Sequence, residues 1–183
     1  LWGRQPGMIA AVTGTNGKTS TVEFLRQIWS RVTWCAASIG TLGLQCDDPR
    51  KMQGSMHGLP PLTTPDAVSL HSALQPLTGA GVTHLAIEAS SHGLAQHRLD
   101  GLNIHIAAFT NLSRDHLDHH EDMDSYFAAK SRLFTDLLLA GGSAVINIDD
   151  EYGAKLAASM RAADPRQHVV ITVGQDKSAD FRI

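Results

Sequence analysis

The feature that most constrains the fold is a glycine-containing segment, residues 13–19, that separates two apolar patterns. The run before it, residues 8–12, reads as a buried strand, and in residues 19–29 apolar side chains recur at helical spacing. A strand, a glycine loop and a helix N-terminus in this order form an anion site, because backbone N–H groups and the helix dipole both point there. Gly14 and Gly17 permit the close backbone approach that such a loop needs. We therefore predict a phosphate-binding loop.

The side chains of this loop indicate which phosphate ligand it holds. Lys18 is placed to reach the β- and γ-phosphates, and the hydroxyl of Thr19 is placed to bind Mg²⁺. Val12 stands where the pattern G-x-x-x-x-G-K-[ST] has its first glycine, so an ordinary strand, turn and helix with a surface lysine is the alternative. We predict ATP and Mg²⁺ as ligands, with these residues around the nucleotide: Gly14, Thr15, Asn16, Gly17, Lys18, Thr19 and Ser20.

Length, charge and cysteine content exclude several classes of protein. The chain has 183 residues, enough for one domain with a substantial core, and its net charge of -3 without a basic run gives no reason to expect nucleic acid. No apolar run approaches the ~18 residues of a membrane span. Two cysteines, Cys35 and Cys46, make no disulfide framework, so we expect a reducing cytoplasm. Because the chain starts without methionine, we expect a part of a longer protein.

The rest of the sequence alternates strand-like and helix-like segments. We predict strands at residues 8–12, 33–39, 83–89, 104–110, 144–148 and 168–173, helices at 19–29, 65–77, 126–139 and 152–160, and loops at 40–61 and 90–98. This alternation predicts an α/β fold, a three-layer P-loop-type domain with a mostly parallel central sheet flanked by helices. In such sheets ligands gather at the carboxyl ends of the strands.

Polar residues stand at these predicted strand ends. Glu88 ends one strand and suits a Mg²⁺ carboxylate, although a solvated strand-end glutamate is the alternative. Asn111 follows the next strand. Thr64 is a good helix N-cap with Pro65 at the first helical position, and the segment alone does not exclude that simple role. Three polar clusters are thus expected at one edge of the sheet: the phosphate loop, Glu88 with the loop after it, and Asn111 with the loop after it.

Two further features leave their roles open on spacing alone. Asp115, His116, Asp118, His119 and His120 resemble a metal cluster, but their spacing is not that of H-E-x-x-H, and a polar loop is the commoner outcome. A zinc hydrolase is therefore a weak alternative, which stoichiometric zinc in the purified protein would revive. The helix at residues 126–139 contains Lys130, and on spacing alone the simple expectation is that its amine extends to solvent.

Taken together, these motifs resemble the Mur ligase family over nearly the whole chain. The resemblance rests on segments that follow one another in the family's order: residues 13–19, 63–66, 88–98, 111–118, 126–130 and 147–151. Within the family, the Ser-Ser-His-Gly-Leu block with Gln96, His97 and Arg98 favours the branch that extends UDP-N-acetylmuramoyl-L-alanyl-D-glutamate.

The resemblance implies an ATP-dependent amide ligase of peptidoglycan precursor synthesis. ATP would phosphorylate a carboxylate of the muramyl dipeptide, and a diamino acid, expected to be meso-diaminopimelate, would attack the acyl phosphate. Residues 1–183 would be the central ATP-binding domain of a monomer, without the UDP-binding and amino-acid-binding domains, and by themselves nearly inactive. The alternatives are a folylpolyglutamate synthase-like ligase and a module that only binds nucleotide.

The resemblance also assigns roles to individual residues. Lys18, Glu88, His116 and Lys130 match the family's catalytic positions. Thr19 and Glu88 match one Mg²⁺ site and His116 a second, which Lys130 would join after carbamylation by CO₂. The positions that hold the muramyl substrate are matched by Thr63, Thr64, Ser90, Gln96 and Arg98, and Asn111 is placed near the nucleotide.

Overall fold

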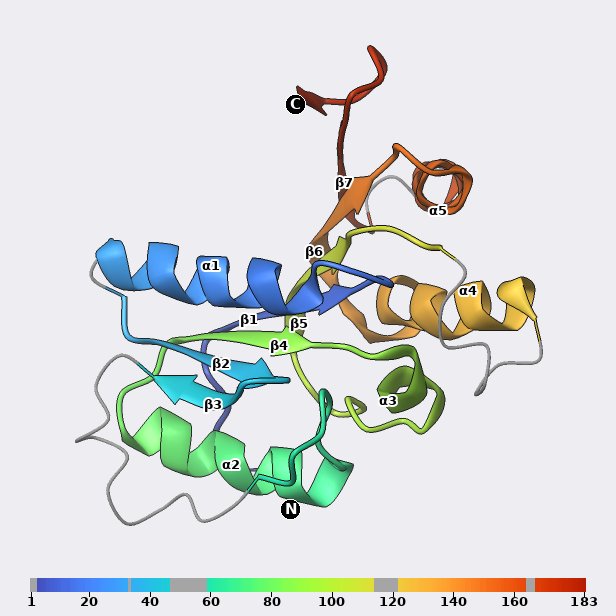
Figure 1. Cartoon of the computed structure of the whole chain (residues 1–183). Coiled ribbons are helices and arrows are strands. Elements are labelled where there is room, and N and C mark those ends of the chain that lie inside the picture. The colour runs from blue at the N-terminus through green and yellow to red at the C-terminus, as the bar shows by residue number, and fades with distance from the viewer. Residues whose placement is uncertain (1–2, 33, 47–58, 114–121, 164–166) are drawn as a thin grey trace.

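The computed structural model describes residues 3–32, 34–46, 59–113, 122–163 and 167–183. Within these ranges one sheet of eight strands runs in the order β3-β2-β4-β1-β5-β6-β7-β8 (Figure 1). The strands are β1 Met8–Thr13, β2 Ala36–Gly40, β3 Gly43–Cys46, β4 His84–Glu88, β5 Ile104–Phe109, β6 Leu138–Asn147, β7 Val169–Gly174 and β8 Phe181–Arg182. Neighbouring strands pair in parallel except β2 with β3, which confirms the predicted, mostly parallel sheet.

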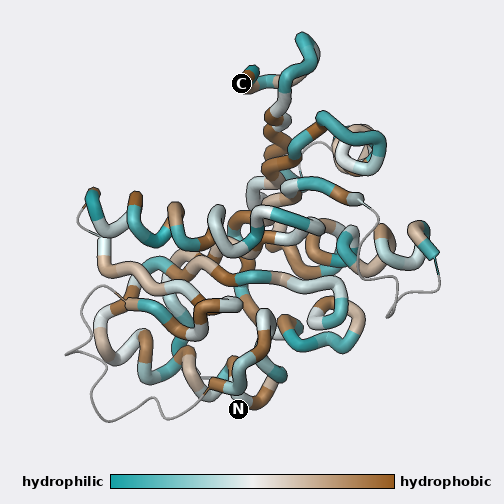
Figure 2. Tube along the Cα trace, viewed as in Figure 1, coloured by the Kyte–Doolittle hydropathy of each residue, from teal (hydrophilic) through white to brown (hydrophobic). Residues whose placement is uncertain are grey.

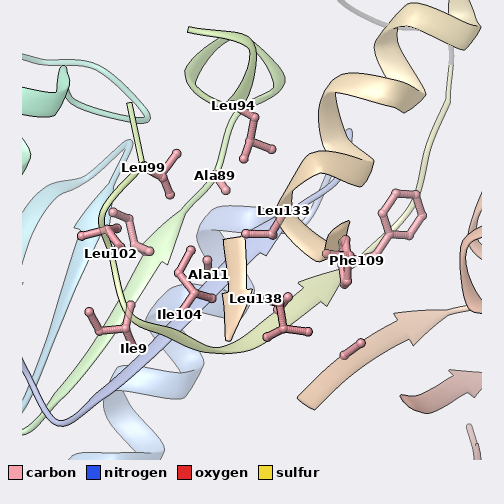
Figure 3. Close-up of a cluster of buried hydrophobic side chains, with 14 of the residues drawn as sticks. Ile9, Ala11, Ala89, Leu94, Leu99, Leu102, Ile104, Phe109, Leu133 and Leu138 are labelled. Atoms are coloured by element: carbon pink, nitrogen blue, oxygen red, sulfur yellow. The ribbon is translucent and has the colours of Figure 1, made fainter. Parts of the chain in front are cut away.

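Helices cover both faces of the sheet and give the predicted three layers (Figure 1). One face packs on α1, Lys18–Arg31, and the other on helices α2 Ala67–Gly79, α3 Ser91–Ala95, α4 Met123–Arg132 and α5 Glu151–Ala162. Along β1 the side chains alternate, so Ile9 and Ala11 join the larger core while Ala10 and Val12 pack beneath α1. Figure 3 shows Ile9 and Ala11 among the other apolar side chains of the larger core.

Two predicted boundaries in the first half of the chain are wrong. Residues 40–61 were expected as one loop, but residues 40–46 form the turn and the second strand of a hairpin, in which β3 pairs antiparallel with β2. The φ of 74° at Gly43 fits this tight turn. Thr64 is not a helix cap, because the side chain of Asp66 caps α2 by accepting a hydrogen bond from the Ser69 N–H.

The second half contains three further differences. The segment 90–98, expected as a loop, contains the short helix α3 with Ser90 as its cap. The helix expected to reach residue 139 ends at Arg132, passes through a π-helical turn, Leu133–Leu137, and gives way to β6. The cause is tertiary, since Leu138 pairs with Ile104 of β5. The strand β8 follows β7 after a turn that Figure 2 shows to be hydrophilic.

Candidate active site

The loop after β1 has the conformation predicted from its glycines. Gly14 has a φ of 145°, and a Cβ added there would lie 1.9 Å from Thr110 Oγ1. Gly17 has a φ of 84° and precedes α1 without a side-chain cap, so the first N–H groups of the helix face the loop without that partner. Ser20 lies exposed in the first turn of α1. This arrangement suits an anion, because unsatisfied N–H groups and the helix dipole coincide.

The end of β5 holds the loop in place. Asn111 accepts a hydrogen bond from the Asn16 N–H through Oδ1 at 3.0 Å and donates from Nδ2 to the Asn16 carbonyl at 3.2 Å. Its own carbonyl accepts from the Thr15 N–H at 2.8 Å. The hydroxyl of Thr110 donates to the Asn16 carbonyl at 2.6 Å. Asn111 therefore lies at the loop as expected, whereas Thr110 was not predicted, although its place beside Asn111 was a signal.

Two lysine amines converge on one carbonyl of the loop. Lys18 Nζ donates to the carbonyls of Gly14 at 2.9 Å and Thr15 at 2.8 Å. Lys130 Nζ donates to the same Gly14 carbonyl at 2.9 Å and lies 4.4 Å from the ring centre of Tyr126. Lys130 is 1% exposed, so the expectation that its amine extends to solvent is wrong. The helix α4 thus brings a second cation to the phosphate loop, from far along the chain.

Glu88 is enclosed by hydroxyl and backbone donors and is 1% exposed, so it is not a solvated strand-end residue. Its Oε2 accepts from Thr19 Oγ1 at 3.0 Å and from Thr41 Oγ1 at 3.3 Å, and its Oε1 accepts from the Thr41 N–H at 2.8 Å. A Cβ on Gly40 would lie 2.1 Å from Oε1. Gly40 and Thr41 were missed because they lie in the segment that was read as a loop.

The pair Thr19 and Glu88 fits the chemistry of Mg²⁺. Both offer oxygen atoms, and the two atoms Thr19 Oγ1 and Glu88 Oε2 are 3.0 Å apart. Adjacent ligands of an octahedral Mg²⁺, at bond lengths of about 2.0–2.1 Å, are separated by about 2.9 Å. His116, the other candidate metal ligand besides Lys130, lies outside the described residues, as does the rest of the 115–120 cluster. Within the described ranges no group of three or more His, Cys, Asp or Glu side chains is gathered as a metal cluster.

The predicted substrate residues form a connected network beside the loop. The Thr64 hydroxyl donates to the Glu88 carbonyl at 2.8 Å and accepts from the Ser90 N–H at 2.9 Å. Ser90 Oγ in turn accepts from the Gly93 N–H at 3.0 Å. Arg98 donates from Nη1 to the Thr64 carbonyl at 2.7 Å and from Nε to Gln96 Oε1 at 3.0 Å. Thr64 therefore joins the strand end of Glu88 to the segment that carries Arg98.

An ion pair ties α4 to this segment. Arg132 donates to the Leu94 carbonyl at 3.1 Å and to Asp100 Oδ2 at 2.7 Å. The hydrogen bond from Arg132 holds the pKa of Asp100 below its usual value, and a second one from His97 adds to this effect. His97 adopts a φ of 59°, the left-handed region that side chains seldom occupy. The turn that precedes Arg98 is thereby fixed to the helix that carries Lys130.

The loop and the network enclose one cavity of about 250 Å³. Six residues predicted from the sequence line it: Lys18, Thr63, Thr64, Ser90, Arg98 and Lys130. Leu62, Ser91, His92 and Tyr126 also line it and had no predicted role. Thr19, Glu88, Gln96 and Asn111 are not part of this lining; Gln96 contacts Arg98 from the exposed side. Three cationic side chains around one cavity favour an anionic ligand.

Comparisons with known proteins agree with this geometry. The sequence model of the Mur ligase middle domain matches residues 12–183. A UDP-N-acetylmuramoyl-L-alanyl-D-glutamate--2,6-diaminopimelate ligase of Rhizobium meliloti (strain 1021) is 51% identical over 99% of this chain and 35% of its own length. A solved structure of an enzyme of the same name has a TM-score of 0.81 and 38% identity, and the match covers 98% of this chain and 34% of that one.

The fold extends to more distant proteins. The folylpolyglutamate synthase of Mycobacterium tuberculosis has a TM-score of 0.64 at 17% identity, over 92% of this chain and 43% of that one, which shows a shared fold alone. The chain spans about a third of the length of the curated diaminopimelate ligases that it matches. No helix in the part of the chain that the structure describes is long and apolar enough to cross a membrane. The match of residues 12–183 and the 51% identity show that this chain belongs to the Mur ligase family.

Proposed function

We propose that this chain is the nucleotide-binding part of an ATP-dependent amide ligase that adds a diamino acid, meso-diaminopimelate, to UDP-N-acetylmuramoyl-L-alanyl-D-glutamate. The observation that carries the proposal is the cavity, in which Lys18 of the phosphate loop and Lys130 of α4 lie with Arg98 of the substrate network. The 51% identical relative is named for this reaction. A ligase that joins a carboxylate to an amine at the expense of ATP has to hold two anions, a triphosphate and a carboxylate, close together.

The phosphate loop would bind the triphosphate. The N–H groups at the start of α1 lack a side-chain cap, and the Lys18 amine, which lies on the Gly14 carbonyl, would reach the β- and γ-phosphates. Oriented donors of this kind stabilise the charge that develops on the phosphoryl group during transfer. Asn111 and Thr110 keep the loop in this conformation through their hydrogen bonds to Asn16. The remaining loop residues contribute backbone rather than charge.

The metal would be held between the loop and the end of β4. Thr19 and Glu88 would supply oxygen ligands, and the 3.0 Å between their oxygens is compatible with adjacent ligands of one Mg²⁺. Bound Mg²⁺ supplies positive charge that offsets the negative charge of the phosphates. Lys130 would join His116 at a second site after carbamylation, because a carbamate is an anionic oxygen ligand. Without that modification the buried Lys130 amine stays on the Gly14 carbonyl of the loop.

The acceptor would approach from the opposite side of the cavity. Arg98 offers a planar guanidinium that suits a carboxylate, and Thr63, Thr64 and Ser90 offer hydroxyl groups beside it. A carboxylate oxygen held there attacks the γ-phosphorus of ATP, the bond to the β-phosphate oxygen breaks, and ADP leaves. The amine of the diamino acid then attacks the acyl carbon, loses a proton and expels inorganic phosphate. The products are an amide, ADP and phosphate.

The first experiment is a product assay on the full-length gene product. We expect the muramyl dipeptide to be extended with meso-diaminopimelate when diaminopimelate and lysine are offered together. A folate substrate should remain unchanged, since only the fold links this chain to folylpolyglutamate synthases. Glutamylation of the folate instead of extension of the muramyl dipeptide would establish the alternative ligase. If the protein binds nucleotide but forms no product, the remaining alternative, a module that only binds nucleotide, would be established.

A variant of the phosphate loop tests the role of this site directly. Lys18→Ala should reduce turnover at least about 100-fold, because an oriented cation at a phosphoryl group stabilises the transition state by several kcal/mol. The matched control is Lys177→Ala, which removes the same charge from an exposed turn. Unchanged nucleotide affinity and turnover in the Lys18 variant would refute the proposed site. We also expect light scattering to show a monomer. We expect a cytoplasmic location, where the thiols of Cys35 and Cys46, which form no disulfide, remain reduced.

A further inference from the structure

The carboxylate of Glu88 is held by a hairpin for which the reaction proposed above requires no role. The hairpin turn, residues 40–43, places Gly40 against the carboxylate, where any Cβ would lie 2.1 Å from Oε1. The turn therefore fits closely around Glu88. It presents Thr41, whose backbone N–H and side-chain hydroxyl both contact the carboxylate, one at each oxygen.

The two contacts of Thr41 give the two oxygens of the Glu88 carboxylate different partners. Oε1 accepts the strong backbone hydrogen bond of 2.8 Å, which turns it toward the hairpin. Oε2 faces Thr19 at 3.0 Å and receives the Thr41 hydroxyl at 3.3 Å. Oε2 is thus the oxygen directed at the candidate Mg²⁺ position. The Thr41 hydroxyl lies on the same oxygen and limits the rotation of the carboxylate.

The donors in this cluster can be assigned because each hydroxyl carries a single proton. The Thr41 hydroxyl donates to Glu88 Oε2. The same hydroxyl lies 3.2 Å from Thr63 Oγ1. Because its single proton is directed at Glu88, the hydroxyl of Thr63 has to be the donor in that second contact. The hydroxyls form a chain from Thr63, at the acceptor side of the cavity, through Thr41 to Glu88.

We propose that Thr41 is a positioning residue, whose hydroxyl orients the Glu88 carboxylate for the metal that accompanies the nucleotide. The proposal rests on the proposed nucleotide and Mg²⁺ site. Thr41 acts through Glu88 and contacts neither the phosphates nor the reacting atoms. Loss of the hydroxyl leaves the hydrogen bonds from the Thr41 N–H to Oε1 and from the Thr19 hydroxyl to Oε2, so the carboxylate as a whole is held less tightly against rotation about its Cγ–Cδ bond. Binding of Mg²⁺ then has to order the carboxylate again, so its affinity falls.

The experiment compares Mg²⁺ dependence in single-atom variants of the full-length gene product. Thr41→Val has nearly the shape of threonine and keeps the backbone N–H, so it removes only the hydroxyl. Binding of a fluorescent ATP analogue is measured with EDTA and at increasing Mg²⁺. The Mg²⁺ concentration at half-saturation should rise about 3- to 10-fold, as for loss of one partly exposed hydrogen bond to a charged group. The affinity with EDTA should not change.

Two further variants separate positioning from general structural effects. Thr41→Ser restores the hydroxyl and should return the Mg²⁺ half-saturation to within about twofold of the wild type. The matched control is Thr83→Val, the same chemical change just before the other end of β4, where the hydroxyl contacts the Cys35 carbonyl. It should leave the Mg²⁺ dependence unchanged. If the valine variant proves insoluble, Thr41→Ala removes the same hydroxyl without adding an exposed methyl group.

The outcomes distinguish this proposal from the proposed function. A wild-type protein that binds the analogue without any Mg²⁺ effect, or not at all, contradicts the nucleotide and metal site itself. A normal Mg²⁺ effect that is identical in the wild type and in Thr41→Val overturns the role of Thr41 and leaves the site intact. A rise in half-saturation that Thr41→Ser does not reverse assigns the effect to the backbone of the turn and also overturns the proposal.

Discussion

Of the two glycines in the phosphate loop, Gly14 is the one at which an added methyl group would meet the closer contact. The φ of 145° at this residue is a region that side chains rarely adopt, with a strain of about 1–3 kcal/mol. The added Cβ would also lie 1.9 Å from Thr110 Oγ1 and 3.1 Å from two backbone atoms of Asn111. Overpacking of this kind costs about 1–3 kcal/mol. We therefore expect Gly14→Ala to lower the free energy of unfolding by about 2–6 kcal/mol.

Two other glycines separate the contributions of strain and contact. Gly43 has a φ of 74° with nothing within 4 Å of an added Cβ, so Gly43→Ala carries backbone strain alone, roughly 1–2 kcal/mol. Gly79, the last residue of α2, has open space and no such φ. Gly79→Ala should be neutral or stabilising by up to about 1 kcal/mol, because alanine has less conformational freedom in the unfolded chain.

The assay is thermal unfolding followed by circular dichroism, with urea midpoints as a second measure. Gly14→Ala should lower Tm by roughly 5–20 °C, taking about 2–4 °C for each kcal/mol in a protein of this size. Adding Thr110→Ala to the Gly14 variant removes the closest contact and should recover part of the loss, but not the strain. A Gly14→Ala protein as stable as Gly79→Ala would refute the geometry described for the loop.

Further predictions concern Lys130 and Asp100. Lys130→Ala should abolish ligase activity, and acetate or formate should restore part of it if a carbamate is the active form. The control variant Lys155→Ala, on α5, should keep full activity. Full activity in the Lys130 variant would refute the role of Lys130. The pKa of Asp100 is lowered, mainly by the hydrogen bond from Arg132, so its ionised form stabilises the folded state. This stabilisation is present above the ordinary aspartate pKa of about 3.9 and is lost as the pH falls through the lower folded pKa. The difference in urea midpoint between wild type and Asp100→Asn should accordingly shrink as the pH is lowered from 7 to 3, and a constant difference would contradict the ion pair.

Local sequence patterns were sufficient to predict those elements whose residues favour, by themselves, the structure that they adopt. The structure confirms β1, the glycine loop and α1. These elements were predictable because apolar periodicity and the positions of the glycines determine them within one short segment. β3 was missed because it forms by backbone pairing with β2, and four residues offer little pattern. The boundary between α4 and β6 was wrong for a related reason, since a leucine-rich run fits a helix until Leu138 pairs with Ile104.

The same distinction applies to the site. Glu88 and Asn111 were identifiable because Glu88 ends a strand and Asn111 follows one, and the carboxyl ends of parallel strands lie at one edge. Thr41 could not be found in this way. Its contact with Glu88 exists because β2 lies beside β4 with Ile39 paired to Ile87, so the residues that follow each strand meet. That pairing skips the intervening helix and loop, and a single sequence carries no local signal of it.

The order of the strands explains why one cavity collects so much positive charge. β4, β1 and β5 are neighbours, so the ends that carry Glu88, the phosphate loop and Asn111 lie side by side. Arg132, on α4, holds the turn before Arg98 through Asp100, and the same helix places Lys130 on the carbonyl of Gly14. Lys18 reaches that carbonyl from α1. The mutual repulsion of these cations is relieved when an anion enters, so the cavity favours a negatively charged ligand.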